Sequence, residues 1–349
     1  MLVPFFPYKD IFKSYRNLFH TSLDKIIDEG QYIFGDELLN FEESISKNIE
    51  NKHCIGVANA TDALEMMLSY HNFSADDEVI LSSHTMVATL SAIIHANAKP
   101  VPVDIQTDGT ICPKDIIKNI NNNTKAIIVT QLNGHTCNMD EIKSICNDNN
   151  LVLFEDSAQA LGSKFKGQSA GTFGFAGCLS FYPAKILGGP GDGGALITND
   201  DNFYDWALAN RDHGRSKNGL EHIGRNSRLD NLMASFLNIQ LKDFEKFVLR
   251  RKDIAKIYND GLKKIKEIRL PNLYNENDSL HFETFQNYEL LVRDRDNLKA
   301  FLSEKKIGSI IQWGGMAIHD LKEYRKNSKS NFIVAKNYFD SCLMLPMNT

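Results

Sequence analysis

Short apolar segments alternate with amphipathic segments through the middle of the chain, and this alternation restricts the possible folds most. The segments expected to be strands are rich in Val, Ile, Leu and Phe and span residues 54–58, 79–82, 101–103, 126–129, 151–154, 178–181 and 194–198. Between them, residues 61–70, 87–96 and 139–147 carry apolar side chains at helical spacing. Strands separated by helices pair in parallel, so the sequence predicts an α/β fold with a mostly parallel, doubly wound sheet covered on both faces.

The pattern changes after about residue 230. A long amphipathic helix is expected over residues 233–249 and a charged helix over residues 250–264. A polar linker at 272–279 and a strand–helix–strand pattern over 285–313 follow. We therefore expect a large domain over residues 1–237 and a smaller C-terminal α/β domain over residues 238–349.

Composition narrows the class of protein. The 349 residues are 42% hydrophobic and 24% charged, which is typical of a globular protein. A net charge of −5 argues against a nucleic acid or an anionic membrane as partner. The six cysteines form no CxxC pair, and residues 1–10 lack the basic start and continuous apolar core of a signal peptide. The apolar runs are too short to cross a bilayer, so we expect a cytoplasmic protein with reduced thiols.

Polar residues collect where the expected strands end. In doubly wound sheets, ligands bind beyond the carboxyl ends of the strands, and Asp156, Ser180 and the turn at residues 59–61 all fall there. The turn joins a strand to a helix, so its free N–H groups and the helix dipole form an anion site, to which the Thr61 hydroxyl adds a donor. A simple N-cap by Asn59 or Thr61 explains the same residues.

Lys185 and Asp156 are the residues that point to chemistry. Lys185 lies in a segment poor in other charges, between aromatic residues and the glycine-rich run 188–194, where desolvation would lower its pKa and make it a nucleophile. Asp156 closes an apolar run, and Gln159 follows three residues later. An amine and a carboxylate in this setting suit pyridoxal 5′-phosphate, which needs a Schiff-base lysine and an acid for its pyridine nitrogen. Asp156 as a helix cap or metal ligand is the alternative, but no His or second acid recurs at ligand spacing.

Several segments together resemble one known family. Residues 155–162, 180–188 and 191–195 are similar to those of the DegT/DnrJ/EryC1/StrS sugar aminotransferases, which have the fold type I architecture of pyridoxal phosphate enzymes. Residues 35–36 with 41–42, 59–64, 83–85 with 88–89, 225–228 and 250–251 also fall in family order, so the resemblance covers nearly the whole chain.

The resemblance implies a role for each matching residue. Lys185 is expected to form the Schiff base with the cofactor, Asp156 to pair with the pyridinium nitrogen, and Gln159 to contact the ring. Asn226, in the run Arg-Asn-Ser-Arg, is expected to reach the phosphate of the neighbouring subunit's cofactor, which makes a homodimer with shared sites necessary.

The remaining positions include departures from the family pattern. The resemblance assigns the phosphate to Ala60, Thr61 and Ser180, and Ala60 stands where the family commonly has Gly. Met86 occupies the position of an aromatic residue that stacks on the ring, and a thioether gives a less defined stack. Gln131 stands where a histidine is common, and the chain stops at residue 349, where relatives usually continue.

The resemblance also implies an activity. We expect an aminotransferase that moves an amino group from an amino acid, L-glutamate, to a nucleotide-linked keto-deoxysugar, making an amino sugar for a surface polysaccharide or a natural-product glycan. One alternative is a dehydratase of the same fold, although such relatives have His in place of the Schiff-base lysine. The other alternative is a non-catalytic regulatory relative, which a missing catalytic residue would favour.

Overall fold

A seven-stranded sheet forms the centre of the molecule in the computed structural model, which describes residues 2–271 and 280–348. The strand order is β1-β9-β8-β5-β4-β2-β3. The strands are β1 (His53–Val57), β2 (Glu78–Ser82), β3 (Lys99–Val103), β4 (Thr124–Thr130), β5 (Val152–Asp156), β8 (Ala176–Ser180) and β9 (Gly194–Thr198). Each begins and ends within two residues of the segment that the apolar pattern predicted.

The sheet is mostly parallel, as predicted, with one reversed strand. Strands β3, β2, β4, β5 and β8 pair in parallel, whereas β9 is antiparallel to both β8 and β1. The prediction of a mostly parallel sheet is confirmed, but the sequence pattern did not mark residues 194–198 as the reversed strand. Residues 181–193 between β8 and β9 contain no helix, and a parallel return requires a crossover that is usually helical.

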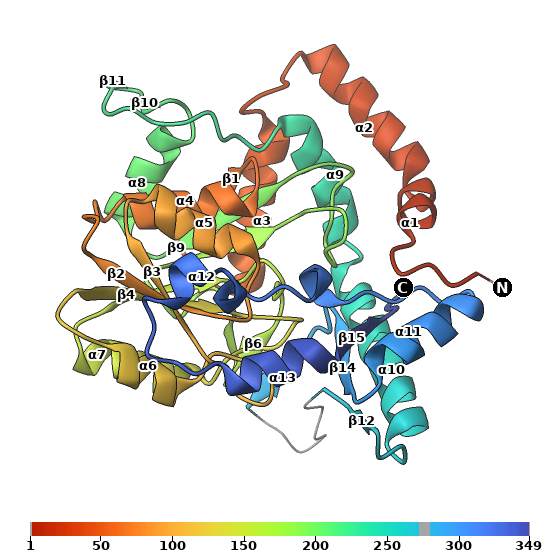
Figure 1. Cartoon of the computed structure of the whole chain (residues 1–349). Helices are drawn as coiled ribbons and strands as arrows, with labels where there is room; N and C mark the ends of the chain where they lie inside the picture. The colour runs from red at the N-terminus through yellow and green to blue at the C-terminus, as the bar shows by residue number, and fades with distance from the viewer. Residues whose placement is uncertain (1, 272–279, 349) are drawn as a thin grey trace.

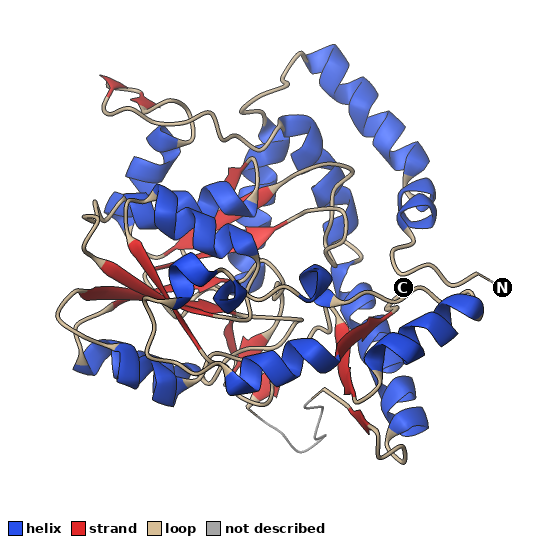
Figure 2. Ribbon diagram, in the orientation of Figure 1, coloured by secondary structure: helices blue, strands red, loops and turns tan. Residues whose placement is uncertain are grey.

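Helices cover both faces of the sheet (Figures 1 and 2). One face packs against α4 (Ala60–Ser69), α5 (Val87–His95) and α8 (Asp201–Asn210), and the other against α3 (Asp36–Ile49), α6 (Pro113–Asn119), α7 (Met139–Asp148) and α9 (Asn231–Leu241). Alternation along β2 explains the two layers, because Val79 and Leu81 face the first set while Ile80 faces the second. Helices α1 (Tyr8–Ser14) and α2 (Arg16–Glu29) project from one side of this body (Figure 1).

A second, three-stranded sheet forms the C-terminal part. Its strand order is β12-β14-β15, and α10 and α11 pack on it while α13 lies between it and the main sheet. The bounds are β12 (Ile268–Arg269), β14 (Tyr288–Val292), β15 (Cys342–Leu345), α10 (Phe244–Leu262), α11 (Arg295–Glu304) and α13 (Ile333–Ser341). The shorter elements are β6 (Lys164–Phe165), β7 (Gln168–Ser169), β10 (Arg215–Ser216), β11 (Gly219–Leu220), β13 (His281–Phe282), η1 (Gln312–Gly315), η2 (Ile318–Asp320) and α12 (Lys322–Arg325).

Two predictions for this part are wrong in detail. The helix break lies between Leu241 and Phe244, not after residue 249, because α9 packs against the main sheet while Ala255 of α10 packs against the small one. The second strand expected near residue 313 is absent, since Ile310 makes only an isolated bridge to Met344. The linker expected at 272–279 lies outside the described residues, and the domain boundary at 237, which falls within α9, stays a prediction.

The strand register brings the polar residues together at one edge of the main sheet. Thr130 at the end of β4 pairs with Asp156 at the end of β5, and Ser180 at the end of β8 pairs with Gly194 at the start of β9. The carboxyl ends of β1, β4, β5 and β8 therefore meet where a ligand site is expected. Across residues 2–271 and 280–348, no helix is both long and apolar enough to span a membrane.

Candidate active site

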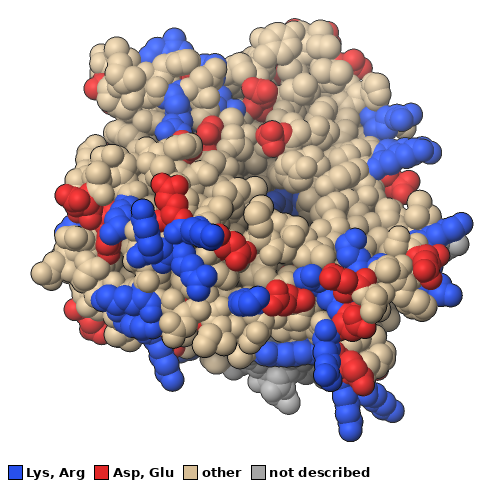
Figure 3. Space-filling model, in the orientation of Figure 1, with Lys and Arg blue, Asp and Glu red and all other residues tan. Residues whose placement is uncertain are grey.

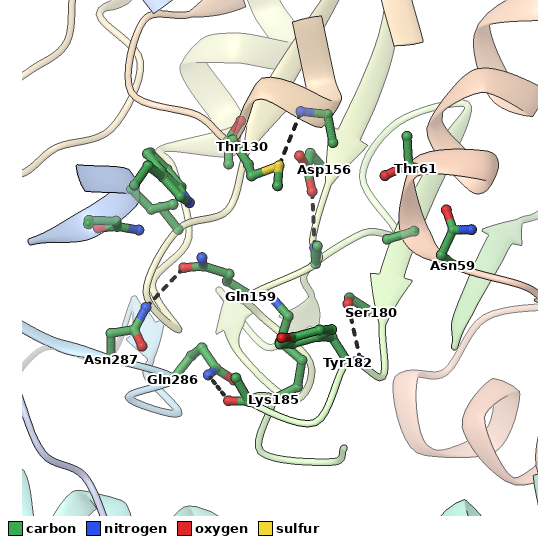
Figure 4. Close-up of a pocket in the computed structure, with 18 of the residues that line it drawn as sticks. Asn59, Thr61, Thr130, Asp156, Gln159, Ser180, Tyr182, Lys185, Gln286 and Asn287 are labelled. Atoms are coloured by element: carbon green, nitrogen blue, oxygen red, sulfur yellow. Dashed lines mark hydrogen bonds between the residues drawn. The ribbon is translucent and has the colours of Figure 1, made fainter. Parts of the chain in front are cut away.

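A cavity of about 510 Å³ opens at this edge of the sheet, between the main sheet and the C-terminal part. Figure 3 shows the molecule hollowed near the centre of one face, with few charged side chains at the rim. The residues predicted from sequence that line the cavity are Ala60, Thr61, Met86, Asp156, Gln159, Ser180 and Lys185 (Figure 4). The fold thus brings together every predicted site residue except Asn226.

Lys185 lies on the loop between β8 and β9, and hydrogen bonds hold this loop from both sides. Its own N–H donates to the carbonyl of Tyr182 at 2.8 Å. The side chain of Gln286 spans the lysine, since its Nε2 donates to the Ala184 carbonyl at 2.8 Å and its Oε1 accepts from the Ile186 N–H at 3.0 Å. A residue one hundred positions away in sequence therefore fixes the backbone that carries Lys185.

Burial lowers the pKa of Lys185 to about 8, from an ordinary value of 10.5. The main cause is the loss of water around the ammonium group, and the carboxylate of Asp156 acts in the opposite direction because it favours the charged form. An amine with this pKa is partly neutral near physiological pH and is available as a nucleophile and proton carrier. The prediction that desolvation would lower this pKa is confirmed.

Asp156 ends β5 with its side chain almost fully buried, at 4% exposure. Its Oδ2 accepts a hydrogen bond from Thr89 Oγ1 at 2.6 Å, and its Oδ1 accepts from the Ala158 N–H at 3.2 Å. These donors stabilise the negative charge of the carboxylate, which forms no ion pair within 4 Å among the described residues. Within that part of the chain, no three His, Cys, Asp or Glu side chains are grouped as a metal site.

Three threonine hydroxyls form a chain that ends on Asp156. Thr130 Oγ1 donates to Thr85 Oγ1 at 2.7 Å, the Thr85 and Thr89 hydroxyls are 2.7 Å apart, and Thr89 bonds to Asp156. An ionised carboxylate can only accept, so Thr89 donates to Asp156 and Thr85 donates to Thr89. Sequence reasoning missed this chain. The available signal was the spacing of Thr85 and Thr89, four residues apart around the start of α5.

The first turn of α4 lines one part of the cavity. Asn59 Oδ1 accepts from the Asp62 N–H at 2.9 Å, so the interpretation of Asn59 as an N-cap is confirmed. Ala60 and Thr61 then line the cavity with the N-terminal end of a helix, which attracts anions. Gly194 makes this placement possible, because a Cβ there would lie 2.4 Å from the carbonyl carbon of Asn59.

The other predicted residues lie around the same space. Gln159 Oε1 accepts from the Asn133 N–H at 3.1 Å and from Asn287 Nδ2 at 3.2 Å. Ser180 contributes a hydroxyl at the end of β8. Met86 lines the cavity with 45% of its surface exposed, and its Sδ accepts from the Ala88 N–H at 3.1 Å. Packing of this thioether on a cofactor ring stays a prediction.

Asn226 does not line this cavity in the single chain. It lies on the loop between β11 and α9, where its backbone bridges to Asp212. The flanking arginines pair within the chain, Arg225 with Glu65 and Arg228 with Asp212, the latter at 2.8 Å. Contact with a neighbouring subunit's cofactor stays a prediction.

Sequence reasoning missed the lining residues outside the family motifs. They include Phe6 from the N-terminal segment and Gln286, Asn287 and Trp313 from the C-terminal part. Trp313 lines the cavity and adopts a left-handed backbone with φ of 47°, which is uncommon for a bulky residue. No local pattern marks these residues, because tertiary packing alone brings them to the site.

Comparison with known proteins identifies the family. Residues 14–349 match the model of the DegT/DnrJ/EryC1/StrS aminotransferase family. The chain belongs to this family. It is 33% identical over 351 residues to the dTDP-3-amino-3,6-dideoxy-alpha-D-galactopyranose transaminase of Aneurinibacillus thermoaerophilus, covering 99% of this chain and 94% of that protein. It is 32% identical over 315 residues to the erythromycin biosynthesis sensory transduction protein EryC1 of Saccharopolyspora erythraea, covering 90% and 85%.

A solved structure supports both fold and family. The chain superposes on S. venezuelae DesV, determined in complex with a ketimine intermediate, with a TM-score of 0.92 and 30% identity, covering 99% of this chain and 93% of that one. Membership of this aminotransferase family makes pyridoxal 5′-phosphate the cofactor. The cavity fits it, because an amine of lowered pKa, a buried carboxylate and a helix N-terminus line a single space.

Proposed function

We propose that this chain is an aminotransferase that moves the amino group of an amino acid, L-glutamate, to the keto group of a nucleotide-linked deoxysugar. The product is an amino sugar for a surface polysaccharide or a natural-product glycan. The observation that carries the proposal is the meeting of Lys185, Asp156 and the N-terminal turn of α4 in one cavity of a family member. The transaminases named among its relatives act on dTDP- and UDP-linked sugars, which supports the substrate class.

Lys185 and Asp156 take separate parts in this reaction. Lys185 binds the cofactor through Nζ and, once displaced by the amino donor, carries a proton to and from the donor's α-carbon. Asp156 holds the protonated pyridine nitrogen by its negative charge, which Thr89 and Ala158 stabilise. The cofactor itself supplies an electron sink for the electrons released at the α-carbon.

The phosphate and ring contacts follow the same arrangement. Ala60 and Thr61 at the start of α4, with Ser180, hold the phosphate, since backbone N–H groups and hydroxyls at a helix N-terminus suit a dianion. Gln159 and Met86, which both line the cavity, would contact the ring of the bound cofactor.

Turnover tests the proposal directly. The purified protein, loaded with pyridoxal 5′-phosphate, is incubated with L-glutamate and a panel of dTDP-, UDP- and GDP-linked 3-keto and 4-keto sugars. We expect 2-oxoglutarate and one amino sugar, detected by mass spectrometry, and no product from Lys185→Ala. Loss of a sugar hydroxyl without gain of nitrogen would instead identify the dehydratase, and cofactor binding without any product would favour the regulatory alternative. One relative is named as a sensory transduction protein, which is the reason for testing the regulatory alternative. The presence of both Lys185 and Asp156 in this chain favours the aminotransferase.

We further propose that the active unit is a homodimer with shared sites. Asn226 lies outside its own chain's cavity, as a residue that serves a neighbouring subunit must. Mixing Lys185→Ala with Asn226→Asp should restore activity, because one site of the mixed dimer then carries both lesions and the other carries neither. Absence of activity in verified heterodimers would refute the shared site. All six cysteines are free, which suits a reducing compartment, and we place the reaction in the cytoplasm.

A further inference from the structure

Asn133 lies just behind the cavity and connects three parts of the chain. It follows β4, and its backbone is left-handed with φ of 58°. Its N–H donates to Gln159 Oε1 at 3.1 Å, and its Oδ1 accepts from Asn287 Nδ2 at 2.7 Å. Its Nδ2 donates to Glu289 Oε2 at 2.8 Å. Gln159 and Asn287 line the cavity, whereas Asn133 and Glu289 are not among the lining residues.

These contacts determine how the amide of Gln159 is turned. Its Oε1 accepts from the Asn133 N–H and from Asn287 Nδ2, so the oxygen faces these two donors on the side of the loop after β4. Figure 4 shows the hydrogen bond between Gln159 and Asn287 that holds the amide on this side. An amide whose oxygen is engaged in this way presents its two N–H donors to the remaining space, which is the cavity.

Glu289 anchors this arrangement from the small sheet. It lies on β14 with only 3% of its surface exposed, and its Oε2 also accepts from Tyr338 OH at 3.0 Å. The Gln312 amide adds donors at 2.7 and 3.1 Å when its nitrogen faces the carboxylate. A buried carboxylate held by several donors has one favourable position, so the Asn133 amide that bonds to it is fixed as well.

We propose that Asn133, held by Asn287 and Glu289, is a positioning residue that orients Gln159 so that its amide N–H groups face the bound cofactor. The inference rests on the ring contact assigned to Gln159 in the proposed function. It adds that the C-terminal part of the chain controls this contact, because Asn287 immediately precedes β14 and Glu289 lies on it.

A binding experiment separates positioning from a general structural role. The probe is 4′-deoxypyridoxine 5′-phosphate, which has the ring and phosphate of the cofactor but no aldehyde, so its binding does not depend on a bond to Lys185. It is titrated calorimetrically into the full chain freed of cofactor. The variants are Asn133→Gly, which keeps the left-handed backbone, Gln159→Ala, and the double variant. The control is Asn150→Gly, an exposed asparagine at φ of 52° in the turn before β5.

We expect Asn133→Gly and Gln159→Ala each to weaken binding roughly fivefold to tenfold, the scale of one hydrogen bond. The double variant should bind no more than about twofold more weakly than Gln159→Ala alone, because Asn133 acts through Gln159. The control should bind as the wild type does. Where Asn133→Gly folds poorly, Asn287→Ala tests the same link and should be equally non-additive with Gln159→Ala.

Two results would overturn the inference. One is additive losses in the double variant, which would show that Asn133 acts independently of Gln159. The other is unchanged probe binding in Gln159→Ala, which would show that Gln159 does not contact the ring. Neither depends on turnover, so failure of the wild type to aminate any keto-sugar would refute the proposed function separately.

Discussion

Replacing Asp156 with Asn should lower the pKa of Lys185 and so make this lysine more reactive at neutral pH in the cofactor-free protein. Burial lowers the pKa of Lys185 to about 8, and the Asp156 carboxylate opposes this effect because it stabilises the ammonium form. Asparagine keeps the shape of the side chain and removes its charge. The desolvation of Lys185 then acts without its largest opposing effect.

The size of the effect follows from the proton equilibrium. With a pKa of about 8, roughly one-tenth of Lys185 is neutral at pH 7. A lysine at its reference pKa of about 10.4 would be neutral in only about one molecule in 2,500. Removal of a neighbouring opposite charge changes a pKa by about 1–3 units. A fall of about one unit in Asp156→Asn would make about half of Lys185 neutral at pH 7 and raise its labelling rate about fivefold.

Competitive labelling measures this midpoint. The cofactor-free chain is treated with an amine-selective acylating reagent from pH 5 to 10, and mass spectrometry follows the peptide that carries Lys185 relative to that of the exposed Lys47. Asp260→Asn, a surface replacement on α10, is the control and should leave the midpoint near 8. A midpoint in Asp156→Asn that is unchanged or higher than in the wild type would show that Asp156 does not act on Lys185 as described.

Three further outcomes are expected. Thr89→Val removes the donor to Asp156 and should lower kcat/KM about 10- to 100-fold. Thr89→Ser keeps the hydroxyl and should retain most activity. Equal kcat/KM values for the two variants would contradict the role of the hydroxyl. Burial raises the pKa of Glu289 to about 7, so its contribution to the free energy of unfolding is complete below pH about 4 and is lost as pH rises through 7. Glu289→Gln should therefore gain about 2–3 kcal/mol relative to the wild type between pH 5 and 8 in urea unfolding, and a parallel pH dependence would disprove this. Gly194→Ala places a Cβ 2.4 Å from the carbonyl carbon of Asn59. The Tm should therefore fall, and binding of the cofactor through its phosphate should weaken. An unaltered Tm would contradict the close approach.

Much of the main sheet and the centre of the site follow from local sequence. The central strands agree with the apolar segments to within two residues, because the alternation of buried and exposed side chains is a property of neighbouring residues. Asp156, Ser180 and the turn at residues 59–61 could be assigned to one edge for the same reason, since each lies at or just past the end of an expected strand. The carboxyl ends of parallel strands then meet without further information.

Only the tertiary structure decided what each of these elements packs against. The break between α9 and α10 lies where the chain passes from one hydrophobic core to the other, and apolar spacing is the same on both sides of it. The direction of β9 depended on the loop that carries Lys185, which folds back without a helix.

The contacts that tune the site were also beyond local pattern. The hydrogen bond between Thr89 and Asp156 joins residues 67 positions apart in sequence. The bond from Gln286 to the Ala184 carbonyl spans 102 positions, and the bond from Asn133 to Glu289 spans 156 positions. The sequence by itself determined which residue types stand at the ends of the strands. The tertiary structure decided their ionisation and orientation, because burial and hydrogen bonding depend on side chains that only the folded chain brings within reach.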